Sequence, residues 1–245
     1  MGPMSDDPRN HLGQPIGAAV PGWTPRPRSA REPIVGAVCR LEPLDADRHA
    51  ADLFAANRID ERARMWTYLS YGPFDSVAEY IEWIQGASRT DDPLFFAVRD
   101  AASGKAVGVT SYLRIDPANG TIEVGHIAYS PALQRTRAAT EAMYLMMQRA
   151  FALGYRRYEW KCDALNAPSR SAAQRLGFSY EGVFRQAVVY KGRNRDSAWY
   201  AAIDGEWPAL DAAFKRWLDP ANFDSQGRQR QRLADLTAPI LKRLG

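Results

Sequence analysis

The sequence of 245 residues has little of what marks a secreted, membrane or metal-binding protein. Its two cysteines, Cys39 and Cys162, have no metal-ligand spacing, so we expect free structural thiols in a reducing compartment and no bound metal. No stretch approaches the roughly 18 consecutive apolar residues of a membrane span. The proline-rich start also lacks the apolar core of a signal peptide, which predicts a cytoplasmic protein without membrane contact.

The net charge of +4 is a small excess that favours acidic ligands in general. Two arginine-rich stretches, Arg26–Arg31 and Arg228–Arg232, contain no aromatic residue that could stack on a base. We therefore expect no nucleic acid partner. A nucleic-acid-associated protein that uses these two stretches is a third interpretation, and a solvated surface explains both of them adequately.

The apolar fraction of 46% is enough for a real core, and the distribution of prolines indicates where that core begins. Prolines recur through residues 1–33 and exclude regular helix there, which predicts an extended arm. Patterned segments fill residues 34–204, which we interpret as one domain. The apolar residues of Pro208–Leu218 and Leu233–Leu244 predict a helical extension over residues 205–245.

Periodicity and turn residues predict the elements of the first half of the domain. The predicted strands are Ile34–Leu41, Leu94–Arg99 and Ala106–Ile115, of which the last two form an antiparallel hairpin. The predicted helices are Asp45–Asn57 and a segment that runs from a capping box at Ser76 to Gly86. Between the helices, the aromatic residues of Met65–Tyr71 either pack in the core or form the wall of a substrate site, and we favour packing.

The centre of the chain joins a strand, a basic turn and a long helix. Thr121–Tyr129 is rich in β-branched and aromatic residues and predicts a strand, whereas Ala138–Leu153 predicts a helix that is apolar around much of its surface. A turn between a strand and a helix presents backbone N–H groups and the positive end of the helix dipole. With Arg135 and Arg137, this turn is a candidate anion site, although arginines in such turns also serve solubility alone.

A second pattern opens at Asn166. Asn166 suits a helix N-cap, Pro168 is tolerated in the first helical turn, and Gly177 suits the end, so the segment predicts a short helix that leads into a strand. The remaining predicted strands are Tyr155–Lys161, Phe178–Tyr190 and Ser197–Ile203.

The turn Gln134–Thr140, followed by the Asn166 helix, resembles two ordered motifs of the GNAT acyl-CoA N-acyltransferases, specifically their RimJ/RimL-like branch. The resemblance covers roughly residues 35–204. It implies an α/β fold with a mixed, twisted, mostly antiparallel sheet, whose two central parallel strands splay to admit the cofactor, and helices on its flanks. It also implies acetyl-CoA as co-substrate, no metal, and an amine-bearing small molecule or a peptide or protein N-terminus as acceptor, with a homodimer left open.

The resemblance assigns cofactor contacts to the strand, the turn and the second helix start. The implied residues are Ile127, Ala128, Tyr129, Gln134, Arg135, Thr136, Arg137, Ala138, Ala139, Thr140, Asn166 and Ser169. The turn departs from the family pattern at Arg137, where a glycine would let a pyrophosphate approach the backbone closely. In this interpretation the Arg137 side chain turns outward, where it could reach a phosphate.

Acyl transfer from a thioester to an amine needs a proton acceptor for the amine and a partner for the departing thiolate. By the resemblance, Glu123 falls where a related branch carries a glutamate base, and a pairing of Glu123 with an arginine is the alternative. His126 is a rival base or a packed strand histidine, and Asp163 is a weaker third candidate. Ser169 is either the thiolate donor or a helix-start cap, since Ala173 stands where many family members have a tyrosine.

The sequence therefore predicts an N-acetyltransferase that moves an acetyl group from acetyl-CoA to a primary amine by direct attack in a ternary complex. The alternative is a catalytically weak sensor or scaffold of the same fold that binds acyl-CoA. Arg137 in the turn and the missing tyrosine at Ala173 would both be compatible with that alternative.

Overall fold

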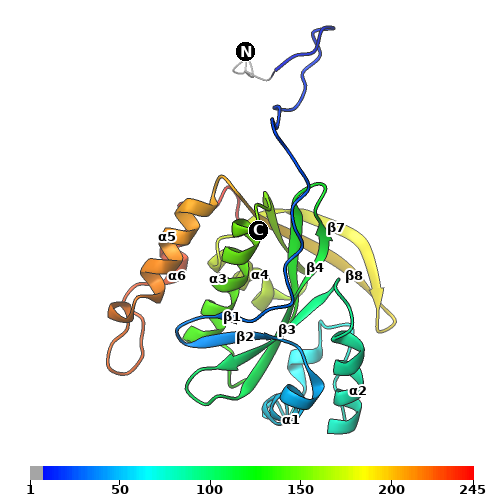
Figure 1. Cartoon of the computed structure of the whole chain (residues 1–245), viewed down its shortest axis with the longest axis vertical. Coiled ribbons are helices and arrows are strands. Elements are labelled where there is room, and N and C mark those ends of the chain that lie inside the picture. The colour runs from blue at the N-terminus through cyan, green and yellow to red at the C-terminus, as the bar shows by residue number, and fades with distance from the viewer. Residues whose placement is uncertain (1–7) are drawn as a thin grey trace.

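The computed structural model describes residues 8–245, which form one eight-stranded sheet with helices on both faces (Figure 1). Residues 1–7 of the predicted arm lie outside the described residues. The strand order is β1-β2-β3-β4-β5-β6-β8-β7, and every neighbouring pair is antiparallel except β5 and β6. The predicted fold, a mostly antiparallel sheet with one central parallel pair and flanking helices, is confirmed.

The predicted helices and strands are present, with differences at their ends, except that the first predicted strand is divided in two. The strands are β1 (Ile34–Val35), β2 (Cys39–Pro43), β3 (Leu94–Asp100), β4 (Ala106–Asp116), β5 (Thr121–Tyr129), β6 (Arg157–Asp163), β7 (Ser179–Tyr190) and β8 (Arg193–Ile203). The α-helices are α1 (Ala46–Asn57), α2 (Val77–Ala87), α3 (Arg137–Ala152), α4 (Ala167–Arg175), α5 (Trp207–Leu218) and α6 (Leu233–Thr237). Short 3₁₀ turns lie at Arg64–Trp66 and Pro220–Asn222.

The predicted single strand Ile34–Leu41 is wrong, because a turn between Val35 and Cys39 divides it into β1 and β2. The cause is Glu141 of α3, whose buried carboxylate accepts hydrogen bonds from the N–H groups of Ala37 (2.9 Å), Val38 (2.7 Å) and Cys39 (2.8 Å). One buried charge therefore fixes an edge of the sheet against a helix from the middle of the chain.

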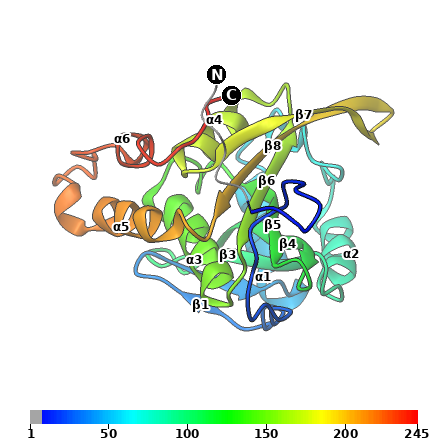
Figure 2. The ribbon, with the colours of Figure 1, turned by 90° about the horizontal axis from the view of Figure 1, so that it is seen from above.

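Two apolar clusters cover the two faces of the sheet. The larger cluster joins α3, α4 and α5 to the sheet and includes Met146, Tyr158 and Phe178. The smaller cluster joins α1 and α2 to the other face and includes Leu53 and Tyr80. Figure 2 shows α2 on one side of the sheet and α3, α5 and α6 on the other. No helix within residues 8–245 has the length and apolar character needed to cross a membrane.

The terminal segments are fastened to the domain by specific contacts. The arm extends away from the domain at its first described residues and packs onto it at Trp23, whose indole Nε1 donates to Ala118 O (2.7 Å) (Figure 1). In the C-terminal extension, Tyr144 of α3 donates its hydroxyl to Asp211 of α5 (2.8 Å). Within Leu233–Leu244, where the sequence predicts a short helix interrupted by Pro239, the helix α6 covers Leu233–Thr237 and ends before that proline, which lacks the backbone N–H that a longer helix would need.

We predict that Glu141→Gln lowers the free energy of unfolding by about 2–3 kcal/mol, because the amide offers one oxygen to three N–H donors and turns its own donor toward them. For a chain of this length the melting temperature should fall by roughly 4–12 °C, measured by scanning calorimetry. The control is Glu32→Gln, the same charge change on the exposed arm, which should stay within about 0.5 kcal/mol of wild type. Equal melting temperatures for all three proteins would contradict the role given to Glu141.

Candidate active site

The parallel strands β5 and β6 separate partway along their length. They pair from Thr121 and Arg157 up to Val124 and Trp160, after which β5 continues to Tyr129 without a partner in β6. Adjacent strands normally satisfy each other's backbone N–H and C=O groups, so this separation leaves backbone groups of β5 facing no strand. Beyond Val124 and Trp160 the backbone of β5 is therefore not hydrogen-bonded to β6, and we call this separation the opening of the sheet.

The turn that follows β5 brings the start of α3 next to the end of that strand. Gln134 Nε2 donates to Tyr129 O (2.7 Å), and the Thr136 side chain caps α3 by accepting from Ala139 N (3.1 Å). The other N–H groups of the first helical turn have no partner within the helix, and the guanidinium of Arg135 is exposed beside them. This geometry suits an anion.

The predicted cofactor residues fall on these elements. They are Ile127, Ala128 and Tyr129 on β5 beyond the separation, Gln134, Arg135, Thr136, Arg137, Ala138, Ala139 and Thr140 in the turn and the start of α3, and Asn166 and Ser169 at the start of α4. The structure thus gathers them on two helix starts and one strand end.

The Arg137 side chain does not turn outward as expected. Its guanidinium donates to the backbone oxygen of Leu218, the last residue of α5, and lies 4.8 Å from the ring centre of Phe223. The carbonyl groups at a helix C-terminus have no intrahelical partner and carry partial negative charge, which explains why they attract a cation. Arg137 therefore fastens the C-terminal extension to α3, and a direct contact of this side chain with phosphate is not supported.

The start of α4 places two polar side chains near β6. Asn166 is the N-cap, as predicted, and its Oδ1 accepts from Ser169 N (3.1 Å). Ser169 Oγ accepts from the indole Nε1 of Trp160 (3.0 Å), so the hydroxyl hydrogen of Ser169 is left to donate elsewhere. Burial raises the pKa of the neighbouring Cys162 thiol, and a hydrogen bond with Ser169 opposes this effect.

Glu123 on β5 is buried between two cations. Arg114 Nη1 lies 2.8 Å from Glu123 Oε1 and 2.9 Å from Oε2, and Lys161 Nζ lies 2.9 Å from Oε2. Burial raises the pKa of Glu123, while Lys161 and Arg114 act in the opposite direction. Lys161 also lies 2.7 Å from Glu159. This is the ion-paired arrangement that the sequence left open, and it engages both carboxylate oxygens.

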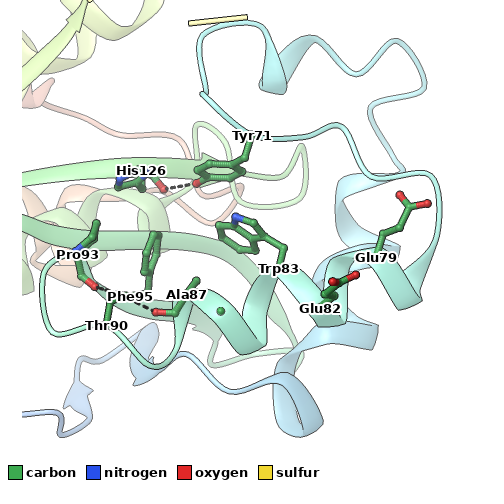
Figure 3. Close-up of a pocket in the computed structure, with 10 residues that line it drawn as sticks. Tyr71, Glu79, Glu82, Trp83, Ala87, Thr90, Pro93, Phe95 and His126 are labelled. Atoms are coloured by element: carbon green, nitrogen blue, oxygen red, sulfur yellow. Dashed lines mark hydrogen bonds between the residues drawn. The ribbon is translucent and has the colours of Figure 1, made fainter.

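His126 occupies a bulge of β5, where its φ of 50° lies in the left-handed region. Its ring stacks on Tyr71, with 5.6 Å between ring centres, and lies 5.0 Å from the ring centre of Phe95. Burial lowers the pKa of His126 to about 4, with smaller contributions from Arg114 and Arg195. The imidazole is therefore neutral at neutral pH and lines a cavity of about 550 Å³ (Figure 3).

Asp163, the third candidate base, holds two loops in place. It accepts hydrogen bonds from the hydroxyl of Tyr190 (3.0 Å) and from Leu165 N (2.9 Å). The hairpin of β7 and β8, which projects beyond the rest of the sheet in Figure 2, also contacts the loop after α1 through Lys191 Nζ and Trp66 O (2.9 Å). The two hydrogen bonds to Asp163 engage both of its carboxylate oxygens and favour a structural role for this residue.

Sequence reasoning missed Lys161 and part of the cavity wall. Lys161 gave no signal, because its contact with Glu123 depends on the pairing of β5 with β6. Trp83 of α2 fits the apolar side of a helix equally well, and Phe95 fits an ordinary buried strand. The aromatic stretch Met65–Tyr71 was the one visible signal. Trp66 packs in the core, as the favoured interpretation of that stretch expects, and Tyr71 lines the cavity, where the role of a substrate-site wall stays a prediction.

A mixed sheet whose central parallel strands separate beside a capped helix start is the architecture of the GNAT class of acetyltransferases. A family model described as "Acetyltransferase (GNAT) domain" matches residues 39–179, which is more than half of the chain. The chain belongs to this GNAT acetyltransferase family, and acetyl transfer is its general reaction.

Solved structures of this class are similar over most of the chain. A GCN5-related N-acetyltransferase from Brucella melitensis is 50% identical, with a TM-score of 0.87, and the match covers 89% of this chain and 100% of that one. A GNAT-family protein from Chromobacterium violaceum is 42% identical, with a TM-score of 0.74, over 80% of this chain and 98% of that one. The ribosomal L7/L12 α-N-protein acetyltransferase RimL, at 24% identity and a TM-score of 0.61, covers 74% of this chain and 99% of its own and shares the fold. No curated protein matches the sequence.

We predict that Arg137→Ala lowers the free energy of unfolding by about 1–2 kcal/mol, since it removes a cation from a helix C-terminus and from the face of Phe223. The segment 219–232 should also become more sensitive to limited proteolysis, read by mass spectrometry. Arg216→Ala, the same charge change on the exposed side of α5, is the control and should leave both measurements unchanged. An unchanged cleavage pattern in Arg137→Ala would contradict the fastening role.

Proposed function

We propose that this protein transfers an acetyl group from acetyl-CoA to a primary amine by direct attack in a ternary complex. The observation that carries the proposal is the separation of β5 from β6 beyond Val124 and Trp160, next to the capped start of α3. The amide groups of an extended ligand can pair with such a strand, and its phosphates can accept from the N–H groups of the helix start. The microcin C7 self-immunity acetyltransferase MccE, 21% identical and similar in fold, was solved in complex with acetyl-CoA and AMP, which is consistent with this choice.

The proposed cofactor contacts follow from these elements. The backbone of Ile127–Tyr129 would pair with the pantetheine amides, and the N–H groups at the start of α3 would hold the pyrophosphate. Arg135, whose guanidinium is exposed at this turn, would supply the positive charge that Arg137 does not. The oxygen of Asn166 is taken by its own helix, so only its amide NH₂ is left for a ligand.

Ser169 is the proposed donor to the departing thiolate. Its oxygen accepts from Trp160, which orients the hydroxyl and leaves its hydrogen available for a sulfur acceptor. Without ligand the buried Cys162 thiol is such an acceptor, and the hydroxyl would turn from it to the departing thiolate. A hydroxyl donor is needed here because Ala173, at the position of the usual tyrosine, is buried and has none.

His126 is the proposed proton acceptor, in preference to Glu123. Both oxygens of Glu123 are engaged by Arg114 and Lys161, whereas no described residue bonds to the ring nitrogens of His126. With a pKa lowered to about 4, His126 is uncharged at neutral pH and keeps a free lone pair for the proton of the attacking amine, although the lowered pKa makes it a weaker base than an exposed histidine. Glu123 would then act by holding the two cations beside the strand.

We also propose the division of the chain into an arm over residues 1–33, an acyltransferase domain over residues 34–204 and a helical extension over residues 205–245. We place the protein in the RimJ/RimL-like branch, and in the cytoplasm because Cys39 and Cys162 are both free thiols. A catalytically weak sensor that binds acyl-CoA is the second candidate, favoured by the absence of a tyrosine at Ala173.

Calorimetry with acetyl-CoA tests both candidates. We expect a dissociation constant in the micromolar range, about −8 kcal/mol. Arg135→Ala should weaken binding roughly fivefold by removing one charge from the turn, whereas Lys105→Ala, the same charge change in the turn between β3 and β4, should not. If the folded protein shows no binding up to millimolar acetyl-CoA, both candidate functions are excluded. Binding without thiol release in the presence of any amine would favour the sensor.

We predict that His126→Asn lowers the single-turnover rate by about 10²–10⁴-fold and leaves acetyl-CoA affinity unchanged. Asparagine tolerates the positive φ of this position, so the bulge should be kept while the imidazole is removed. Glu123→Gln should mainly lower stability, because it leaves Arg114 without its carboxylate partner. Full activity in His126→Asn together with a large rate loss in folded Glu123→Gln would move the proton acceptor to Glu123.

A further inference from the structure

The cavity next to His126 lies between the bulge of β5 and the end of α2 (Figure 3). Its volume of about 550 Å³ suits a small organic molecule better than an ion. Because His126 immediately precedes Ile127–Tyr129, the cavity begins at the point where the strand opens for the proposed cofactor. It is therefore placed to hold the body of an acceptor whose amine reaches that point.

A row of three rings forms one wall of the cavity. Tyr71 stacks on Trp83, with 4.4 Å between ring centres and 29° between planes, and on His126, with 5.6 Å and 24°. Figure 3 shows Tyr71 between the other two rings. Phe95 adds an edge contact to Trp83 at 5.6 Å. Trp83 also stacks on Tyr80, with 5.6 Å between ring centres and 7° between planes, so the faces of Tyr71 and Trp83 are covered by their neighbours and the wall presents ring edges. Ring edges pack on the face of a flat aromatic group, so the wall favours such a group over a flexible polar one.

The charged groups that line the cavity are both acidic. Glu79 and Glu82 of α2 are exposed on the far side of Trp83 from His126 (Figure 3). Glu79 accepts a hydrogen bond from Asp75 N (3.1 Å), whereas the carboxylate of Glu82 has no hydrogen bond or ion pair with any residue of the range 8–245. Among the described residues no lysine or arginine lines the cavity; Arg114 and Arg195 lie near enough to His126 to help lower its pKa, and His126 itself is neutral. The end away from His126 is therefore suited to a positive group.

We infer that the acceptor is a primary amine joined through a flat apolar group to a second, positively charged group. The reacting amine lies at His126, the flat group packs on Tyr71 and Trp83, and the second cation lies near Glu82. This inference rests on the proposed function only for the identity of the reacting amine. The recognition of a flat dication by the cavity stands on the rings and carboxylates alone.

Four amines of related shape test the inference by calorimetry on the full chain with coenzyme A present. 1,4-Bis(aminomethyl)benzene should bind about fivefold more tightly than benzylamine, which lacks the second amine, after the factor of two for its two equivalent amines is removed. It should bind more than tenfold more tightly than 4-(aminomethyl)benzoate, because that compound carries a negative charge where the diamine carries its second positive charge. It should also bind about tenfold more tightly than 1,6-diaminohexane, which has both cations and no ring.

Variants separate the two parts of the cavity. Glu82→Gln should remove the preference for the aromatic diamine over benzylamine, and Glu32→Gln on the arm should not. Gly86→Phe adds a ring at a helical position where a Cβ meets nothing within 4 Å, so it should leave the fold intact, reduce binding of all aromatic amines and leave acetyl-CoA affinity unchanged. Trp83→Ala should abolish the preference for a ring, but it also removes core packing.

The outcomes distinguish this inference from the proposed function. Equal affinities for the aromatic diamine and 4-(aminomethyl)benzoate, or for the aromatic diamine and 1,6-diaminohexane, would overturn it, even in protein that binds acetyl-CoA and acetylates amines. If the protein binds the aromatic diamine selectively but does not bind acetyl-CoA, the inferred specificity of the cavity is supported and the proposed acetyltransferase function is contradicted. In active protein, Glu82→Gln should raise KM for the aromatic diamine and leave kcat unchanged.

Discussion

The extra residue in β5 is the constraint on which the rest of the site depends. Between Val109 and Ser111 of β4, the pairing with β5 skips two residues, His126 and Ile127, and the pairing of β5 with β6 ends just before that point, at Val124. A bulge bends a strand and increases its twist, so it turns β5 away from β6 while β4 stays attached. The same irregularity directs the His126 ring to the α2 side and leaves the following backbone at the opening. The strand proposed to bind the cofactor and the cavity proposed to hold the acceptor thus share one cause.

Next to this bulge, a row of alternating charges on β4, β5 and β6 holds the strands together. Glu123 and Glu159 are direct partners on the parallel strands, where two carboxylates would repel each other. Lys161, two residues further along β6, reaches both of them at 2.9 and 2.7 Å, and Arg114 and Arg157 complete the row. Because removal of one partner would leave another charge buried and unpaired, the row resists rearrangement. The row therefore holds β5 and β6 rigidly together just before the point where they separate.

Local patterns predicted those parts of the structure that local interactions decide. Asp45, Ser76 and Asn166 each cap the helix that they were expected to start, because a cap needs only a side chain and a backbone N–H three residues later. The failures have distant causes: Glu141 divides the first strand from 102 to 104 residues away, and Leu218 draws Arg137 from 81 residues away. The separation of β5 and β6 was predicted from the family resemblance alone, because hydrophobic periodicity does not indicate where two paired strands stop pairing. The cavity was hidden for a similar reason, because Trp83 and Phe95 carry ordinary core patterns.

The fastening of Arg137 explains how the chain can do without a glycine in the turn. A glycine makes room above the backbone, and a side chain that is held to the far side of the helix leaves the same room. The extension that holds it also holds α4, through Gln174 Nε2 to Gly245 O (2.7 Å) and Thr237 Oγ1 to Arg175 O (3.1 Å), and Arg175 itself donates to Thr140 of α3 (2.9 Å). The start of α3 and the end of α4 are therefore tied to each other and to one C-terminal segment. It follows that residues 205–245, although they lie outside the matched family domain, help to hold α3 and α4 in place, and that the arginine and the extension depend on each other.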